Sequence, residues 1–566
     1  MKRSMSVLAR RCGMAAGLSL ALVSGAQAAG GTLSGSGTSA SPYLISDYAD
    51  LAAIGTGSYS VKAVYRLASD IDASSSATAH GDSGFVPLVF RGTFHGAGYA
   101  IRNLVIHRVG VPDIGLFSYL DTAAVVDSLV LEGVSVTGSD AVGGLVAYNR
   151  GKVSDCSVSG SVWGDSASYV GGLVGYHMGA VVNSRSTASV GGRKAEEVGG
   201  LVGLSYGGSL SRSAFSGAVV DTATNAMVGG LAGMLQGANV DSCSSSGSVT
   251  AIGDSARVGG WVGVSNDARI LFAVSGGSVQ VNGAHGYAGG LIGLSWGDTI
   301  FGSYATGSVS GGEAGNVGGL FGAVQNSIVA SCYATGAVAG PGENAYAGGL
   351  VADNESGQIY DSYATGSVKA MGSNSLAGGF AGLNGGLIYG CYASGNVAGS
   401  VTSILGGFSG GNQDSIVSSY WNASVSGMDS GVGGAIVSAF ADVHGLSAAQ
   451  MRQASSYSDW DFDSTWSLAA SDSAPRLFVL ASTSASAVGA KSLRGKIAPT
   501  WTVSGHCLTV SVADAFEVTL RELSGRMLSR VSGVGTAKLE LPVGMMAVAT
   551  VRTNRGQSSF LVPVAH

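Results

Sequence analysis

Short apolar runs, broken by glycine, serine and asparagine, recur along most of the chain at a nearly constant interval. Each repeat contains a glycine followed by a large apolar residue, and successive repeats are 28 to 30 residues apart. Turn-forming residues separate two or three short runs of strand-like composition within each repeat. The pattern predicts strands rather than helices. The repeat glycines are Gly115, Gly144, Gly172, Gly200, Gly230, Gly260, Gly290, Gly319, Gly349, Gly379 and Gly407.

Repeats of this size cannot bury an apolar face alone, but stacked repeats can pair each strand with its equivalent in the next repeat. The residue after the motif glycine is large and apolar from Leu145 to Phe408, as an inward-facing ladder requires. Two positions later the residue is always Gly or Ala, from Ala147 to Gly410, which allows a tight corner. We predict an all-β fold, a parallel β-helix (solenoid) of about eleven coils of 28–30 residues. A propeller is the alternative, but its blades usually need about 40 residues or more.

The repeat strings resemble a known family. GGLVG followed by SYATGSV, as at 303–309 and 362–368, resembles the GLUG repeat of bacterial surface and secreted proteins. The stretches at 41–106 and 419–466 resemble the segments that open and close such arrays. The resemblance implies a parallel β-helix and surface exposure. It implies no single activity, because such repeats accompany adhesins, haemagglutinin-like proteins and some peptidases, and a fold does not fix a function.

The N-terminus predicts export. Four basic residues at positions 2–11 precede an apolar run at 14–23 that ends in Ala26-Gln27-Ala28. We expect residues 1–28 to be a secretory signal peptide, cleaved before Ala29. The protein is then secreted or held at the outer cell surface. No apolar run reaches the roughly 18 residues of a transmembrane helix.

The mature chain is divided by changes in this pattern. We expect an N-terminal cap with the first coils at 29–113, solenoid repeats at 114–440, an array-closing segment at 441–480 and a Ser/Ala-rich linker at 481–496. The remaining residues, 497–566, alternate like a small C-terminal β-sandwich. Their strings LRELSGRMLSR and LPVGMMAVATV resemble the C-terminal sorting domain of type IX secretion cargo, which implies a sorting or anchoring module.

Composition limits the possible partners. The 93 Gly and 8 Pro in 566 residues, with 11% charged residues, describe a chain that turns often and buries much surface, not a disordered one. Loss of the four basic signal residues changes the formal net charge from −6 to −10. Such a surface lacks the basic footprint of a nucleic-acid binder.

The sequence strings that resemble catalytic motifs are better explained as turns of the fold. GDSG around Ser83 is the sequence around a trypsin-like nucleophile, and HGAG at 95–98 is typical of an oxyanion loop, but both match turns of the array opener. No zinc or calcium motif is present, so neither metal nor cofactor is expected. We expect no disulfide, because Cys332 and Cys391 lie two coils apart, about 9–10 Å, beyond the roughly 7 Å limit for a bridge. The cysteines at this repeat position are Cys156, Cys243, Cys332 and Cys391.

Two residue groups remain as candidate sites. Asp353, Glu355 and Asp361 form an acidic group, although the coils on either side offer no carboxylate to converge with it. Polysaccharide cleavage is therefore the alternative hypothesis. A row of tyrosines offers aromatic rings that either bind sugars or only stack to stabilise the coil, and the stacking role is favoured. These are Tyr304, Tyr333, Tyr363, Tyr392 and Tyr420.

Together these features predict a non-catalytic scaffold or adhesin that binds through its extended surface. Its partners are expected among glycans, host or matrix proteins and cell-surface proteins.

Overall fold

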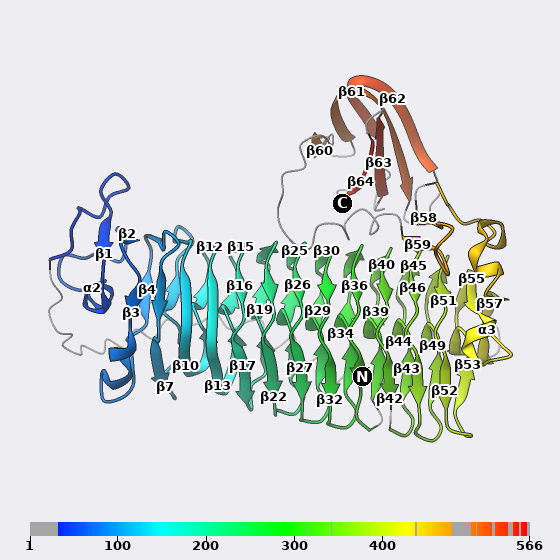
Figure 1. The fold of residues 1–566 in the computed structure, drawn as a ribbon, viewed down its shortest axis with the longest axis horizontal. Helices are drawn as coiled ribbons and strands as arrows, with labels where there is room; N and C mark the ends of the chain where they lie inside the picture. The colour runs from blue at the N-terminus through cyan, green and yellow to red at the C-terminus, as the bar shows by residue number, and fades with distance from the viewer. Residues whose placement is uncertain are drawn as a thin grey trace.

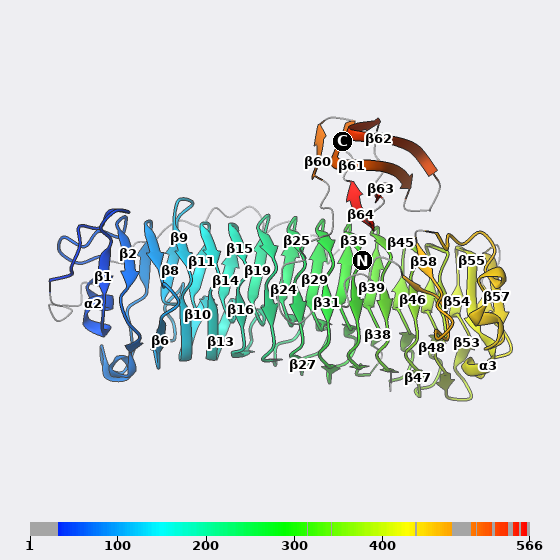
Figure 2. The same cartoon turned by 45° about the horizontal axis from the view of Figure 1, so that its top comes forward.

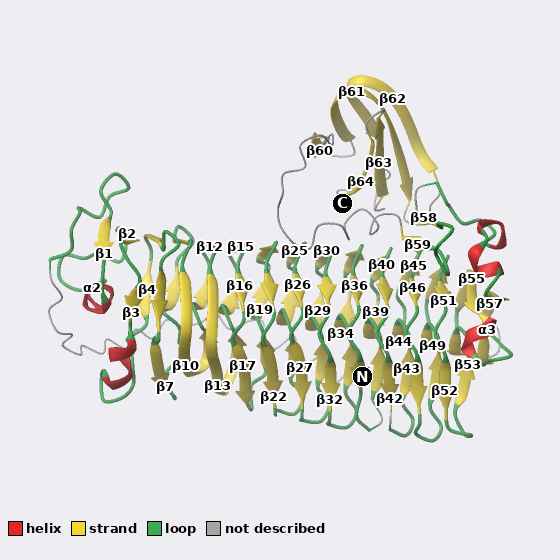
Figure 3. Ribbon diagram, viewed as in Figure 1, coloured by secondary structure: helices red, strands yellow, loops and turns green. Residues whose placement is uncertain are grey.

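The computed structural model describes residues 32–477 and 500–562, apart from 314, 341, 436–438, 464, 505–506, 523–526, 541–546 and 554–555. Its main body is a rod of stacked coils (Figure 1). Helices within the described residues occur at the two ends of the rod (Figure 3). The predicted parallel β-solenoid is confirmed.

One coil from the middle of the rod shows the plan. It contains β35 (Thr299–Phe301), β36 (Tyr304–Ala305), β37 (Val309–Ser310), β38 (Asn316–Gly318) and β39 (Phe321–Gln325). Each strand pairs in parallel with its equivalent one coil later, so that Tyr304 pairs with Tyr333 and Asn316 with Tyr346. The interval of about 30 residues is therefore the length of one turn of the solenoid.

The strands form two long sheets. One contains 44 strands and wraps around most of the coil, whereas the other contains 13 strands and follows the motif glycines. Strands of the 13-stranded sheet lie in line along the rod (Figure 2). Its strands are β4 (Leu88–Phe90), β8 (Phe117–Leu120), β11 (Val146–Asn149), β14 (Val174–His177), β19 (Val202–Tyr206), β24 (Ala232–Gln236), β29 (Val262–Asn266), β34 (Ile292–Trp296), β39, β44 (Val351–Asn354), β49 (Ala381–Asn384), β54 (Ser409–Asn412) and β56 (Val432–Ala435).

The predicted inward ladder is the core of the rod. Each member from Leu145 to Phe408 is fully buried, including Trp261. The opposite wall of the coil is close to the motif glycine and carries a small residue there. A Cβ on Gly319, the residue before Leu320 of the ladder, would approach the Ala334 side chain to 3.0 Å. Phe380 and Phe408 stack with their ring centroids 4.8 Å apart.

The glycines of the motif are required by close backbone approach. A Cβ on Gly289 would collide with the carbonyl oxygen of Ile292, three residues later. The small residue further along the motif has a similar cause, because a Cβ on Gly203 would lie 2.6 Å from the Gly175 carbonyl oxygen. The chain therefore folds back on itself at this corner.

A second corner contains the Ser/Cys position of the repeat. The residue before it has a positive φ in coil after coil, for example Asp361 with φ 43°. Ser362 then donates its hydroxyl to the Tyr360 carbonyl oxygen at 2.7 Å and accepts the Cys332 amide N–H at 3.1 Å. The four cysteines at this position of the solenoid are buried free thiols. Burial raises the pKa of Cys332 to about 12, so its thiol stays neutral at physiological pH.

The coil pattern extends further toward the N-terminus than the first repeat glycine. β1 (Tyr43–Ile45) pairs with β2 (Val64–Leu67), which pairs with β5 (Thr93–His95), in register with the later coils. The short helix α2 (Tyr48–Ala53) lies between β1 and β2, with the Asp47 side chain accepting the Asp50 N–H at its start. Tyr65, Phe90, Phe94 and Phe117 are fully buried in this end of the rod.

The other end of the rod is closed by a single tryptophan and by the segment that follows it. β55 (Ser415–Asn422) places Trp421 where added Cβ atoms on Gly407, Gly431 and Gly445 would meet its ring. The chain continues through α3 (Ala423–Ser426), β56 and β57 (Phe440–Leu446). It then forms two 3-10 turns (Gln450–Arg452 and Ala454–Ser456) and a small hairpin of β58 (Trp466–Ser467) and β59 (Arg476–Leu477).

The expected linker at 481–496 and the signal peptide at 1–28 lie outside the described residues. The C-terminal strands form one five-stranded antiparallel sheet. The runs at 508–512 and 516–520, which the sequence presents as separate strands, belong to one long strand with a bulge between Val512 and Ala515. The strands are β60 (Thr500–Ser504), β61 (Cys507–Glu522), β62 (Met527–Glu540), β63 (Ala547–Thr553) and β64 (Gly556–Val562).

Candidate binding surface

The predicted tyrosine row exists as a continuous stack on the outside of the solenoid. Ring centroids are 4.6 Å apart for Tyr304 and Tyr333, 4.8 Å for Tyr333 and Tyr363, and 5.0 Å for Tyr363 and Tyr392. The ring planes of each pair lie within 6° of parallel. Tyr420 continues the same register position by pairing with Tyr392. Because each ring covers the face of the next, mainly ring edges and hydroxyl groups remain for contact with a partner.

The closing segment covers the C-terminal part of this row. Tyr363, Tyr392 and Tyr420 have exposed fractions of 9%, 2% and 3%, whereas Tyr304 and Tyr333 are only partly buried. The covering side chains belong to the end of β57 and to the segment that follows it: Leu446, Met451, Tyr457, Trp460, Phe462, Trp466, Ala474 and Leu477.

Hydrogen bonds fix the closing segment to the row. The Tyr392 hydroxyl donates to the Pro475 carbonyl oxygen at 2.7 Å, and the Tyr420 hydroxyl accepts the Ser458 N–H at 2.8 Å. The Trp460 indole donates to the Ser418 carbonyl oxygen at 2.9 Å. Burial raises the pKa of Tyr363 to about 12 and that of Tyr392 well above its usual value, so these hydroxyls remain neutral donors. Three of the five predicted ligand-binding tyrosines, Tyr363, Tyr392 and Tyr420, are therefore covered by the closing segment of the same chain.

A second tyrosine row, missed by the sequence reasoning, lies on the 13-stranded sheet. Tyr119 and Tyr148 stack at 5.6 Å, and Tyr148 and Tyr176 at 4.6 Å. All three are half-buried, and Tyr169 from the neighbouring wall meets Tyr176 edge-on at 5.0 Å. The signal was present, because each tyrosine lies three residues after the apolar motif residue in GLFSY, GLVAY and GLVGY. Leu204, Met234 and Val264 continue the same surface position as an apolar cluster.

The structure divides the predicted acidic group. Asp353 lies in β44 between Ala323 and Leu383 of the adjacent coils, as the repeat register predicts. Burial raises its pKa to about 7, and the Glu355 carboxylate contributes to the rise. Gln325 donates to Glu355 at 2.8 Å. Asp361 belongs to the left-handed corner instead, where burial raises its pKa to about 8 with a contribution from Asp461.

The protease-like strings form turns. His80, Asp82 and Gly84 all have positive φ, so the backbone around Ser83 changes direction repeatedly. The HGAG string spans the end of β5 and a turn in which Ala97 has φ 55°. His95 pairs through Nδ1 with Asp127 at 2.8 Å on the neighbouring coil.

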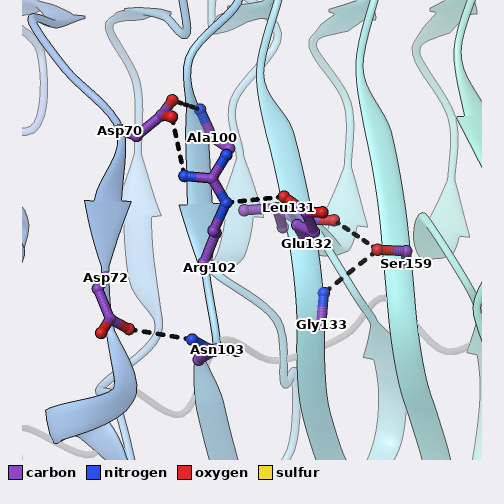
Figure 4. Close-up of polar contacts among 9 residues, drawn as sticks. All are labelled: Asp70, Asp72, Ala100, Arg102, Asn103, Leu131, Glu132, Gly133 and Ser159. Carbon is purple, nitrogen blue, oxygen red and sulfur yellow. Dashed lines mark hydrogen bonds and ion pairs between the residues drawn. The ribbon is translucent and has the colours of Figure 1, made fainter.

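A polar ladder crosses the first coils on the solenoid surface (Figure 4). The Arg102 guanidinium bridges Asp70 and Glu132, at 2.8 Å to each, and thereby links three successive coils. Asn103 donates to Asp72 at 3.1 Å alongside it. The charged side chains are about half exposed, and such ion pairs typically contribute about 0–1 kcal/mol, so the ladder aligns the coils more than it stabilises them.

Within the described part of the chain, no cluster of three or more His, Cys, Asp or Glu residues could hold a metal ion. A search of the same residues finds no helix long and apolar enough to cross a membrane.

Comparison with known proteins locates the repeat. Residues 131–162, from β10 (Val130–Gly143) through β11 into β13 (Ser157–Gly171), match the family described as the GLUG motif. The array carries a GLUG motif. The chain is also 38% identical over 142 residues to halomucin from Haloquadratum walsbyi. That match covers 23% of this chain and 2% of halomucin, so the chain spans only a small part of its relative.

Among solved structures, the chain is similar to a Bacteroides ovatus protein provisionally named an immunoglobulin A1 protease. The TM-score is 0.31 at 18% identity, covering 53% of this chain and 77% of the other.

Proposed function

We propose that this protein is an exported, surface-associated, non-catalytic scaffold or adhesin that binds through the outer faces of its solenoid. The observation that carries the proposal is the solenoid itself, whose 13-stranded sheet provides a long regular outer surface. The GLUG motif and the likeness to halomucin, a mucin by name, support a surface location. Glycans and host, matrix or cell-surface proteins are the proposed partners.

The two tyrosine rows are the proposed contact surfaces. In the first row, Tyr304 and Tyr333 are only partly buried, so part of each side chain remains exposed. In the second row, Tyr119, Tyr148 and Tyr176 are half-buried and stack along the 13-stranded sheet. A glycan and matrix-protein array tests the proposal. Saturable binding that Tyr148→Ser or Tyr333→Ser weakens supports it, and no binding on any array contradicts it.

Residues 497–566 are proposed to sort or anchor the protein. The resemblance to type IX secretion cargo and the separate antiparallel sheet support this role. Deletion of 497–566 is expected to release the protein from the cell surface or to block its export, as measured by fractionation. Unchanged surface display of the truncated chain would contradict it.

Polysaccharide cleavage is a second candidate, favoured by one observation. Asp353, with a pKa raised to about 7, lies beside the Glu355 carboxylate, and a protonated acid next to a carboxylate is the pair that glycoside hydrolysis uses. New reducing ends or unsaturated products from plant, algal or host glycans, lost in Asp353→Asn, would establish it. Binding without products favours the scaffold.

A further inference from the structure

The closing segment is a strap laid over one outer row of the solenoid. Residues 457–475 run back along the tyrosine row, from Tyr420 past Tyr392 toward Tyr363. Trp460 and Trp466 stack at 4.3 Å and both contact Tyr392, at 6.2 and 5.8 Å. The strap is therefore held by aromatic contacts and by the three hydrogen bonds described above, not by continuation of the solenoid sheets.

Besides the tyrosines, a carboxyl side chain lies next to this strap. Asp361 occupies the left-handed corner immediately before the Ser362–Tyr363 pair. Its carboxylate lies over Gly390 of the next coil, where a Cβ would come within 2.9 Å of Oδ1. Ser331 and Ser418 occupy corresponding left-handed corners in other coils. Asp155 is an acid at the corresponding corner of an early coil, whereas in the coils that the strap crosses Asp361 is the acid at this corner.

Burial and a nearby like charge disfavour the negative charge of Asp361, and together they outweigh one strap group that favours it. Asp461 on the strap acts on it electrostatically, and the Trp466 indole on the strap opposes the rise in its pKa. On the next coil, burial raises the pKa of Tyr389 and of Cys391, and the Asp361 charge adds to both rises; Asp459 of the strap also acts on Tyr389. Among the residues that the structure describes, no basic side chain contributes to the pKa of Asp361. Its ionisation under the strap is therefore opposed by burial and by like charge.

We propose that the strap is an alkali-released cover, closed over the tyrosine row while Asp361 is neutral and opened when Asp361 ionises. Opening uncovers Tyr363, Tyr392 and Tyr420 and lengthens the accessible row beyond Tyr304 and Tyr333. The use of that row for binding rests on the proposed function, whereas the opening itself does not.

The direction follows from linkage. The pKa of Asp361 is raised to about 8 in the closed form, and opening returns it toward the ordinary value for aspartate. Closure is therefore most stable below that ordinary value and is lost as pH rises through about 8. The opening constant is expected to rise about tenfold between pH 7 and pH 9.

Hydrogen exchange on the full chain tests the proposal at the Ser458 N–H, which donates to the Tyr420 hydroxyl. After correction for intrinsic exchange, the opening constant should rise about tenfold between pH 7 and pH 9 in the natural chain. It should stay constant in Asp361→Asn and in Asp361→Ser, which copies the corner of Ser331 and Ser418. Circular dichroism checks that each variant keeps its solenoid.

Asp298→Asn is the matched control, because Asp298 is also a buried carboxyl with a raised pKa but bonds to Ser265 and Ser295 instead of the strap. This control should keep the tenfold rise. A flat profile in the natural chain, or an unchanged rise in both Asp361 variants, overturns the proposal. Neither outcome bears on whether the solenoid binds glycans, which the array experiment decides.

Discussion

A serine or cysteine follows the left-handed corner in coil after coil, and its side chain accepts a backbone N–H from the coil before it. Ser362 accepts from Cys332 at 3.1 Å, and Cys391 accepts from Ser362 at 3.4 Å. The alternation of Ser and Cys at this position is thus explained by a shared hydrogen-bonding role in a buried site. Either a sulfur or an oxygen acceptor is sufficient for this bond.

Removal of one acceptor from this ladder should destabilise the solenoid. Ser362→Ala leaves the buried Cys332 N–H without its partner, and an unsatisfied buried donor costs about 1–3 kcal/mol. Ser362→Cys should retain most of the stability, because cysteine occupies the same position in other coils. Thermal unfolding followed by circular dichroism compares the two. Equal melting temperatures for both variants would show that the ladder bond is not needed.

Asp298 predicts an unusual pH dependence. Its carboxylate accepts the Ser265 hydroxyl at 3.0 Å, the Ser295 hydroxyl at 2.6 Å and the Ala268 N–H at 2.8 Å, and burial still raises its pKa to about 7. Because the folded pKa exceeds the unfolded one, its contribution to stability is greatest at acid pH and is lost as pH rises from about 4 to 7.

Asp298→Asn should therefore reduce the loss of stability between pH 5 and pH 8, by up to about 3 kcal/mol in unfolding free energy. Denaturant unfolding at the two pH values measures the difference. Asp429→Asn, at an exposed position, is the control and should leave the pH dependence unchanged. A pH dependence in Asp298→Asn identical to that of the control would refute the role of this carboxyl.

At the scale of the strand and its corners, backbone contact decides where glycine is required. A Cβ on Gly289 would collide with the Ile292 carbonyl oxygen, whereas a Cβ on Gly276 would meet nothing closer than 3.8 Å. Gly289→Ala should lower the unfolding free energy by about 1–3 kcal/mol, as overpacking usually does. Gly276→Ala should be nearly neutral. A comparison of their melting temperatures checks the assignment, and equal values would contradict it.

Much of the arrangement of strands and corners could be predicted from the sequence. The repeat interval located the coils, the ladder residues and the register that pairs Tyr304 with Tyr333, because identical coils must stack in register to bury identical faces. The closing segment was recognised by its position, but not its path along the tyrosine row. That path depends on contacts between residues such as Tyr392 and Pro475, which are 83 positions apart and belong to no repeat.

The candidate site was less predictable for a related reason. The row of Tyr119, Tyr148 and Tyr176 is hard to recognise in the sequence because only three coils share it. In the next two coils the same position is occupied by Leu204 and Met234. The sequence presents Asp353, Glu355 and Asp361 as one acidic group, yet Asp353 lies in β44 and Asp361 lies at the left-handed corner, where each faces different neighbours. Residues that are close in sequence can face different neighbours within a coil, because eight positions are enough for the chain to turn a corner.

At the scale of the whole molecule, the rod is a one-dimensional stack in which each coil pairs only with its neighbours. Removal of one complete coil should therefore let the coils on either side of it stack directly on each other, with equivalent strands paired. Deletion of residues 316–345 joins Gly315 to Tyr346, which occupies the register position of Asn316. All other strand pairings can re-form one coil closer together.

We expect this deletion variant to fold with an unchanged circular dichroism spectrum and a rod about 4.8 Å shorter, the spacing of one strand. Deletion of residues 316–330 removes only part of the coil, brings unlike strands opposite each other and should abolish cooperative unfolding. Small-angle scattering measures the rod length, and thermal melts report the cooperativity. A full-coil deletion that unfolds as readily as the partial one would show that contacts beyond nearest neighbours hold the rod together. The strap is the element to suspect in that case, because it lies across several coils at once.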